Sequence, residues 1–303
     1  MANNVAEQRS AAIATMPLRH AGRAAGSGPL APIKELWARR DLVVLLTKRE
    51  IRARYKDSSL GIAWSLLRPL AQLLVYYFAL GELLGLSRQI PNFALFVFIG
   101  LTGWTFYAEV VQKATQSIVH NGGLVKKVYL PREVFPLASL GSGLFTFFVQ
   151  FIILIAAIVI LKEVPSLSAL PYAIAGFALI AIVALGLGIL LAAVNVYLRD
   201  IEHLVEVAFV VLFWASPVVY SFRFVNEKVG GTWLETAYLC NPITLGILGM
   251  QRGLWASGAS PEVGGWPPNL PWLIVLGFAI GCAFLVFAHW VFNRLQGNFA
   301  QEV

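Results

Sequence analysis

Long runs of apolar residues recur at six places along the chain. They cover about residues 61–86, 93–111, 135–161, 168–194, 204–220 and 271–292. Each run has about the 17 to 25 residues that a helix rising ~1.5 Å per residue needs to cross the hydrocarbon core of a bilayer. The pattern therefore predicts six transmembrane helices within a domain over residues 58–303.

The chain before the first run has two different patterns. Residues 1–30 are rich in Ala, Gly and Ser with scattered Arg, and this composition predicts a disordered cytoplasmic tail without a cleavable signal sequence. Over residues 31–57, Ile33, Val44 and Ile51 recur at helical spacing with Lys and Arg on the other faces. This second pattern predicts an amphipathic helix that lies in the headgroup plane.

The segment from Ser221 to Leu270, before the last run, is the longest on its side of the membrane. Asn241 suits a helix N-cap and Pro242 suits the first helical position, so we expect a helix to begin there. About fourteen residues are too few to span a bilayer, which favours short re-entrant helices on the outer side. A helix that rests on the outer leaflet is the alternative. The expected fold class is thus an all-α integral membrane protein.

Composition and charge agree with a membrane location. The chain is 58% apolar and 13% charged with a mean hydropathy of +0.72, which excludes a soluble globule. Seventeen Lys and Arg fall before the first run, in the 112–134 and 195–203 loops and in the C-terminal tail, against five on the opposite side. This bias predicts a multi-pass protein of the bacterial inner membrane with both termini in the cytoplasm. The net charge of +7 also favours anionic lipids, and we expect no nucleic-acid partner.

The motifs of catalysis and metal binding are missing from the sequence. It contains no GxxxxGK[ST], HExxH or GxSxG pattern, its four histidines are dispersed, and its two cysteines are far apart. Ionisable residues in the apolar runs lie near the predicted span ends, so no ion relay crosses the midplane. We therefore predict no catalytic residue, no metal site and no cofactor in this chain, which is not an enzyme by itself.

Four segments together resemble one family. They are "RARYKDSSLGIAWSLLRPL", "HNGGLVKKVYLPREVFPL", "NVYLRDIEHL" and "LCNPITLGIL". From about residue 33 to the C-terminus the chain resembles the membrane subunit of ABC-2 transporters, in particular the branch that exports polyprenyl-pyrophosphate-linked polysaccharides of the O-antigen, teichoic acid or galactan type. The resemblance implies a homodimer of this chain on two copies of a separate ATPase, which binds ATP and Mg²⁺. An ABC-2 permease for a small drug or lipid and a membrane-embedded enzyme acting on lipid-linked sugars are the alternatives.

The resemblance also implies where the ATPase docks. The inner loop after the second span matches the family's coupling helix, and the loop after the fourth span matches a second contact. The residues are Asn121, Gly122, Gly123, Lys126, Lys127, Pro131, Arg132, Arg199 and Asp200. The alternative is that the basic members only mark the cytoplasmic side.

Cations lie where a lipid-linked substrate would enter. A pyrophosphate at the inner leaflet needs positive groups at headgroup depth, and the arginine fork suits bidentate phosphate contacts. The expected set is Arg49, Arg52, Arg54, Lys56 and Arg68. For Arg68, contact with phospholipid headgroups and pairing with an acid such as Glu109 are the alternatives.

Aromatic residues on the first and fifth spans are the expected channel lining, because the family places those spans at its channel and pyranose rings present apolar faces. They are Tyr76, Tyr77, Phe78, Phe213, Trp214 and Tyr220. Packing against lipid is the alternative. The outer helix, with Asn241, Pro242, Leu245, Leu248 and Met250, is the expected gate.

Overall fold

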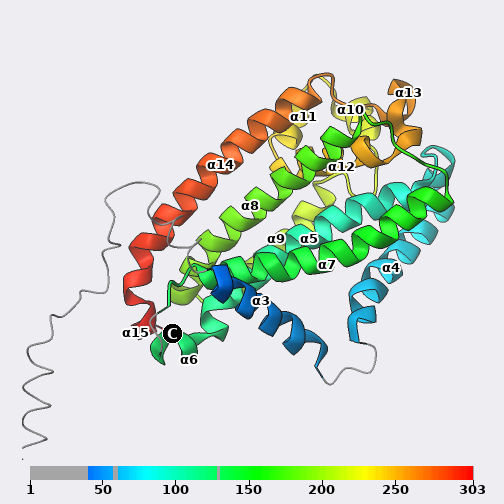
Figure 1. The fold of residues 1–303 in the computed structure, drawn as a ribbon. Coiled ribbons are helices and arrows are strands. Elements are labelled where there is room, and N and C mark those ends of the chain that lie inside the picture. The colour runs from blue at the N-terminus through cyan, green and yellow to red at the C-terminus, as the bar shows by residue number, and fades with distance from the viewer. Residues whose placement is uncertain (1–39, 57–60, 128–129, 303) are drawn as a thin grey trace, which may run out of the picture. The chain divides into compact units, whose positions relative to one another are not determined.

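The structure is a computed structural model that describes residues 40–56, 61–127 and 130–302 (Figure 1). The described residues form helices and connecting segments and contain no strand, which confirms the all-α prediction for this part of the chain. The predicted disordered tail over 1–30 and the beginning of the predicted 31–57 helix lie outside the described residues. The remainder of that predicted helix is α3, Arg40–Tyr55.

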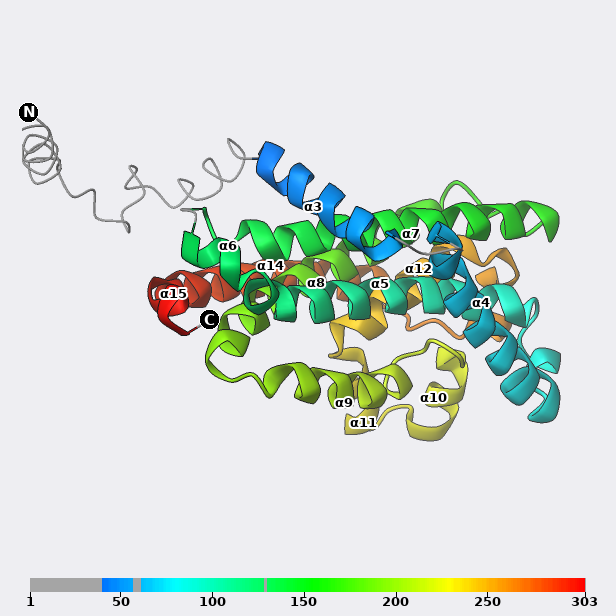
Figure 2. The same cartoon turned by 90° about the horizontal axis from the view of Figure 1, so that it is seen from below.

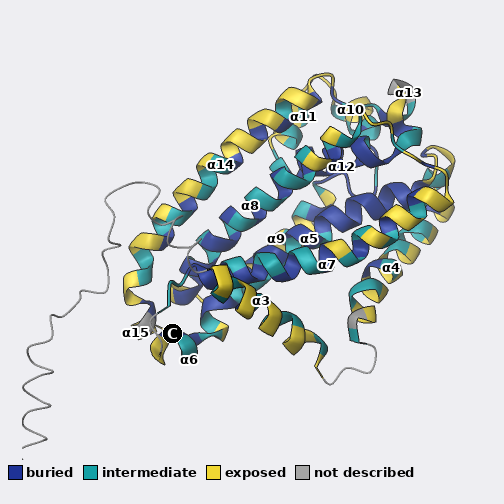
Figure 3. Ribbon diagram, viewed as in Figure 1, coloured by how far each residue is buried: buried dark blue, intermediate teal, exposed yellow. Residues whose placement is uncertain are grey.

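Four helices of the described chain are long and apolar enough to cross a membrane. They are α5 (Phe93–His120), α7 (Val134–Ile160), α8 (Leu170–Tyr197) and α14 (Leu270–Leu295). Helix α5 is the most buried of the four, since α7, α8 and α12 (Pro242–Leu254) pack around it (Figures 1 and 3). Helix α14 exposes a large apolar face that suits contact with lipid.

The first predicted span differs from a continuous helix. It begins with the 3-10 turn η1 (Gly61–Ala63) and continues as α4 (Trp64–Tyr76), which contains Pro69. The chain then forms a π-helix, η2 (Tyr77–Leu83), followed by the 3-10 turn η3 (Leu86–Arg88). A proline removes one helical N–H donor, and π-helical turns are rare, so this segment departs from the regular hydrogen-bond pattern of a span.

The fifth predicted span, 204–220, is helical only in its first part. Helix α9 (Ile201–Trp214) has 14 residues, about 21 Å, against the ~30 Å of a hydrocarbon core. The following residues 215–219 are mostly buried and not helical. Side chains of α12 hydrogen-bond to their carbonyl groups: Gln251 Nε2 donates to Pro217 O at 2.7 Å and Thr244 Oγ1 donates to Ala215 O at 3.3 Å. Irregular backbone is tolerated at membrane depth when protein groups satisfy it in this way.

Short helices gather at the two ends of the long ones. One end, which we call the α12 end, carries the beginning of α5 and the short helices α10 (Phe222–Val229), α11 (Trp233–Leu239), η4 (Ala256–Ala259) and α13 (Pro261–Gly264). The other, the α6 end, carries α6 (Gly122–Lys127), the turn between α8 and α9, η5 (Gln296–Asn298) and α15 (Phe299–Glu302) (Figures 1 and 2). The long helices thus connect two different sets of short elements.

Helix α12 begins as the sequence predicts. Asn241 is its N-cap and accepts a hydrogen bond from Ile243 N at 3.1 Å, and Pro242 is the first helical residue. The helix then crosses α8 at very short range, because a Cβ on Gly176 would lie 2.5 Å from the carbonyl oxygen of Gly246. Small residues at such a crossing let two backbones approach closely.

Candidate functional site

The described residues contain a cavity of about 560 Å³ between α3, α4, α5 and α7. Most of the residues that line it have polar or charged side chains, and two are tryptophans. It is lined by Arg54, Tyr55, Trp64, Ser65, Arg68, Pro69, Gln72, Trp104, Thr105, Ala108, Glu109, Gln112, Lys113, Gln116, Thr146 and Gln150. Polar and charged side chains are costly to keep at membrane depth, so this cavity is the candidate functional site.

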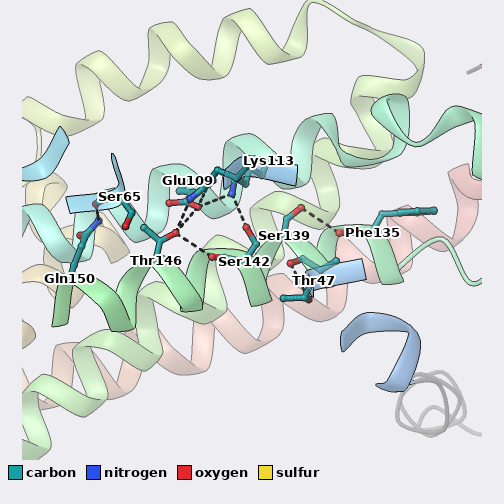
Figure 4. A network of polar contacts seen from close by, with 11 residues as sticks. Thr47, Ser65, Glu109, Lys113, Phe135, Ser139, Ser142, Thr146 and Gln150 are labelled. Atoms are coloured by element: carbon teal, nitrogen blue, oxygen red, sulfur yellow. Dashed lines mark hydrogen bonds and ion pairs between the residues drawn. The ribbon is translucent and has the colours of Figure 1, made fainter. Parts of the chain in front are cut away.

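Two polar stripes at helical spacing run along α5 and α7, and every member except Ser142 lines this cavity. On α5, Glu109, Gln112, Lys113 and Gln116 follow one another at i, i+3, i+4 and i+7. On α7, Ser142, Thr146 and Gln150 recur every fourth residue, and Figure 4 shows Glu109 and Lys113 of the first stripe facing Thr146 and Ser142 of the second. Residues at these spacings share one helix face, so the two helices turn their polar faces together and leave their apolar faces for packing.

Glu109 is the centre of the polar contacts (Figure 4). Its Oε1 accepts hydrogen bonds from Arg54, from Lys113 Nζ at 2.8 Å and from Thr146 Oγ1 at 3.1 Å. Arg54 also donates to Thr146 Oγ1 at 2.9 Å, and Lys113 donates to Ser142 Oγ at 2.7 Å. The carboxylate therefore ties α3 and α7 to α5.

Positive charge exceeds negative charge on the cavity wall. The lining holds three cations, Arg54, Arg68 and Lys113, and a single carboxylate. Within the described chain, the ion pairs of Glu109 are with Arg54 and Lys113, and Arg68 makes no ion pair. Arg68 lies on the same cavity as Glu109, so a bound anion would meet it beside Arg54.

Gln150 gives the cavity a buried acceptor. The side chain is only 1% exposed, and its Nε2 donates to the carbonyl oxygen of Ser65 at 3.4 Å. Its Oε1 is buried and has no hydrogen-bond partner among the described residues. Buried polar atoms are normally paired, and an unpaired one costs roughly 1–3 kcal/mol. A ligand that donates a hydrogen bond in the cavity would satisfy this atom after a rotation of the Gln150 side chain, which itself lines the cavity.

Of the five cations expected to hold a pyrophosphate, the structure places two at the cavity and three away from it. Arg54 and Arg68 line the cavity. Arg49 points instead to the end of α5, where it donates a hydrogen bond to Asn121 Oδ1. Arg52 and Lys56 are exposed and do not line the cavity.

The expected channel aromatics also fall into groups. Tyr76 of α4 stacks on Phe213 of α9, with ring centroids 5.6 Å apart, and Trp104 of α5 meets the same Phe213 ring edge-on at 5.4 Å. Tyr220 donates to the carbonyl oxygen of Trp214 at 2.6 Å. The remaining two, Tyr77 and Phe78, lie on the π-helix, where the Phe78 side chain is 62% exposed.

Three of the five expected gate residues are part of the core. Leu245, Leu248 and Met250 are almost fully buried, and Asn241 Nδ2 donates to Ser216 Oγ at 3.2 Å. Movement of α12 would have to break these contacts together with the close crossing with α8. The gate role stays a prediction.

The residues expected at the ATPase lie together at the α6 end. Asn121 caps α5, and α6 holds Gly122 and Gly123 at its beginning and the exposed Lys126 and Lys127 in its last turn. After α6, Pro131 and Arg132 lead into α7, and the Arg132 guanidinium lies 5.5 Å from the centre of the Phe299 ring in α15. Arg199 and Asp200 are exposed in the turn before α9.

Several cavity residues were not among those that the sequence predicts. Lys113, Gln112 and Gln116 fall in the predicted 112–134 loop, because the second apolar run ends at residue 111, whereas α5 continues to His120. Trp104, Thr146 and Gln150 lie within predicted spans. The signal that could have found them is the recurrence of polar residues every three or four positions, since apolar runs with such a stripe have a buried polar face.

Comparison with known proteins agrees with this architecture. The ABC-2 type transporter family matches residues 41–255. Two Klebsiella pneumoniae relatives named O-antigen export system permease protein RfbA are each 29% identical over 265 residues, which cover 86% of this chain and 94% of the relative. A Myxococcus xanthus relative of the same name is 28% identical over 196 residues, 65% of this chain and 74% of the relative. With its long apolar helices and a family match over most of its length, the chain belongs to the ABC-2 type transporter family.

Proposed function

We propose that this chain is the permease subunit of an ABC transporter that exports a polyprenyl-pyrophosphate-linked polysaccharide of the O-antigen type across the inner membrane. The observation that carries the proposal is the cationic cavity between α3, α4, α5 and α7, because a lipid-linked glycan presents a pyrophosphate at headgroup depth. The relatives named O-antigen export permeases support the class of cargo.

The cavity offers a group for each part of such a headgroup. Arg54 and Arg68 would contact the pyrophosphate, and Lys113 would add a third positive charge. Trp64 lies near the beginning of α4 and would provide an apolar face for a sugar ring, while the buried Gln150 Oε1 would accept a hydrogen bond from a sugar hydroxyl.

The working assembly would contain more than this chain. In this proposal two permease chains form a dimer with six spans each, and both termini face the cytoplasm. The segments 61–86 and 204–220 then complete their spans with π-helical and non-helical backbone, and α10 to α13 form the outer, partly re-entrant layer. Two copies of a separate ATPase bind ATP and Mg²⁺ and dock at the α6 end.

Depletion of the protein tests this function directly. We expect long polyprenyl-linked glycan to accumulate inside the cell and the matching surface polysaccharide to be lost, measured by extraction and sugar analysis of both pools. Normal amounts in both pools would refute polysaccharide export and favour a small-molecule cargo. Accumulation of only short precursors would point to an enzyme of glycan synthesis.

Complementation then tests the cavity. We expect the double variant Arg54→Gln, Arg68→Gln to restore surface polysaccharide at least ~10-fold less well than wild type, since two contacts to a charged group are worth roughly 3 kcal/mol or more. Arg88→Gln is a matched control, because Arg88 is an exposed arginine of η3 near the α12 end. If the double variant and the control complement equally well at equal protein levels, export does not depend on this cavity.

A further inference from the structure

Glu109 occupies the position in the cavity that an anionic ligand would take. Its contacts all meet at Oε1, where Arg54, Lys113 and Thr146 donate. The carboxylate is only 13% exposed, and its two cationic partners are about 30% exposed. Donors converging on one oxygen are the arrangement by which proteins bind phosphate oxygens.

We propose that Glu109 is an internal anion that occupies the cation site when no substrate is bound, so that a headgroup must displace it from Arg54. The proposal rests on the function proposed above, because it assigns the incoming anion as a pyrophosphate. Glu109 would then determine the specificity of the site through competition.

The charge of the wall explains why such a competitor is useful. With three cations and no carboxylate, a partly buried cavity would attract any phosphate, including the anionic phospholipids of the surrounding leaflet. Glu109 lowers the net charge of the wall and adds the cost of separating Arg54 from its partner. A phospholipid diester carries one negative charge and a pyrophosphate diester carries two, so the attraction of the wall for the pyrophosphate is about twice as large. Both headgroups face the same cost of separating Arg54 from Glu109. Only the pyrophosphate retains useful affinity.

The neighbouring residues suit an exchange of partners. Lys113 follows Glu109 by four residues on α5, so the two stay paired within one helix when Arg54 leaves. Arg54 comes from α3 and lies 2.9 Å from Thr146, whose hydroxyl holds it at the cavity wall. Displacement therefore leaves Glu109 with a counter-charge and Arg54 free to bind the ligand.

Binding measurements on the full-length protein in phosphatidylcholine nanodiscs test the proposal, with inorganic pyrophosphate and inorganic phosphate as probes in calorimetry. We expect Glu109→Gln to bind both probes ~10-fold or more tightly than wild type, since an unfavourable charge and an exchange cost are removed together. Arg54→Gln should bind pyrophosphate more weakly. Glu227→Gln is the matched control and should behave as wild type, because it removes a carboxylate from the α10 pair with Arg223 near the α12 end.

A second measurement asks whether selectivity is lost. Nanodiscs that also contain phosphatidylglycerol should leave pyrophosphate binding by wild type nearly unchanged but weaken binding by Glu109→Gln several-fold, because the lipid phosphate now competes. If the glutamine variant does not fold, Glu109→Asp takes its place. Its shorter side chain withdraws the carboxylate from Arg54 and should give an intermediate gain in affinity.

The outcomes separate this inference from the function beneath it. In one outcome Glu109→Gln binds pyrophosphate as tightly as wild type or more weakly, and Arg54→Gln binds it more weakly than wild type. Glu109 would then only hold α3 to α5, which would overturn the inference and leave the anion site in place. No pyrophosphate binding by any of the variants or by wild type would overturn both the inference and the proposed pyrophosphate site.

Discussion

Glu50 shows at the scale of one residue how α3 balances charge against burial. The side chain precedes Arg54 by one helical turn, and its Oε2 is buried without a hydrogen-bond partner in the described structure. Burial raises the pKa of Glu50 to about 7. The charges of Arg49 and Arg54 oppose this rise and that of Glu109 adds to it. Glu50 is therefore partly protonated in the folded protein near neutral pH.

This raised pKa makes a testable prediction about stability. Between pH 4.5 and about 7 the folded protein binds more protons at Glu50 than the unfolded chain, so its contribution to stability is present below pH 4.5 and is lost as the pH rises through about 7. Glu50→Gln keeps the shape without the charge. We expect its thermal midpoint to exceed that of wild type by a few degrees at pH 8 and to match wild type near pH 4.5.

Differential scanning fluorimetry in detergent across this pH range gives the comparison. Glu227→Gln serves as the control, because Glu227 is exposed on α10 and should give no pH-dependent difference. A constant difference between Glu50→Gln and wild type at all pH values would contradict the burial argument.

Single polar residues were harder to place from the sequence than the helices that carry them. Arg54 lies just before the first apolar run and Arg68 lies just inside it, so the sequence could name both as cations at headgroup depth. It left open whether Arg68 pairs with Glu109. The structure pairs Glu109 with Arg54 and Lys113 instead. That choice depends on how α3 and α7 lie against α5, which hydrophobic periodicity does not determine.

At the scale of elements, hydrophobic patterning predicted the regular helices well. The runs 135–161, 168–194 and 271–292 match α7, α8 and α14 to within a few residues. The two runs that are not continuous helices have a proline away from a helix start: Pro69 lies inside α4, and Pro217 lies in the non-helical residues after α9. The prolines of the regular runs, Pro136, Pro171 and Pro271, lie in the first turn of α7, α8 and α14. A run of apolar residues indicates that a segment is buried in lipid or protein. A regular helix also needs a backbone N–H at each interior residue to donate the helical hydrogen bond, and proline has none.

The crossing of α8 and α12 allows a prediction at this scale. A Cβ on Gly176 would lie 2.5 Å from the Gly246 carbonyl oxygen and 2.9 Å from Met250 N, and backbone atoms cannot move aside as a flexible side chain can. We expect Gly176→Ala to destabilise the protein by about 1–3 kcal/mol, through overpacking of a close helix contact. Thermal unfolding in detergent, followed by size-exclusion chromatography, measures the effect.

Gly297→Ala is the matched control, since a Cβ at this position meets no atom within 4 Å. It should unfold at the wild-type temperature. If Gly176→Ala unfolds there too, the two helices must separate more easily than their packing indicates, which would favour the movement that the gate role of α12 requires.

At the scale of the whole molecule, contacts connect the cavity with the α6 end. Helix α3 binds both regions: Arg54 reaches Glu109 at the cavity, and Arg49, five residues earlier, donates to Asn121 at the beginning of α6. On the other side of α6, the buried Phe299 of α15 packs edge-on against Phe292 of α14, with centroids 5.5 Å apart. The surface that would receive an ATPase is therefore built from helices that also contact the cavity or belong to the last span.

This arrangement predicts the effect of reversing charge at the α6 end. Lys126 and Lys127 are exposed in the last turn of α6. If they complement an acidic groove on the ATPase, the double variant Lys126→Glu, Lys127→Glu should reduce both co-purification of the ATPase and ATP hydrolysis by the complex ~10-fold or more, because like charges then face each other across the contact. Folding should be unaffected, since neither side chain is buried.

The double variant Arg88→Glu, Lys228→Glu makes the same change in net charge on exposed residues near the α12 end. It should hydrolyse ATP at the wild-type rate, which separates a docking effect from a general response to charge. A second separation comes from pyrophosphate binding, which the α6 variant should retain, because its lysines do not line the cavity. If the α6 variant hydrolyses ATP at the wild-type rate, Lys126 and Lys127 only mark the cytoplasmic side of the membrane. The ATPase would then have to dock at the turn with Arg199 and Asp200.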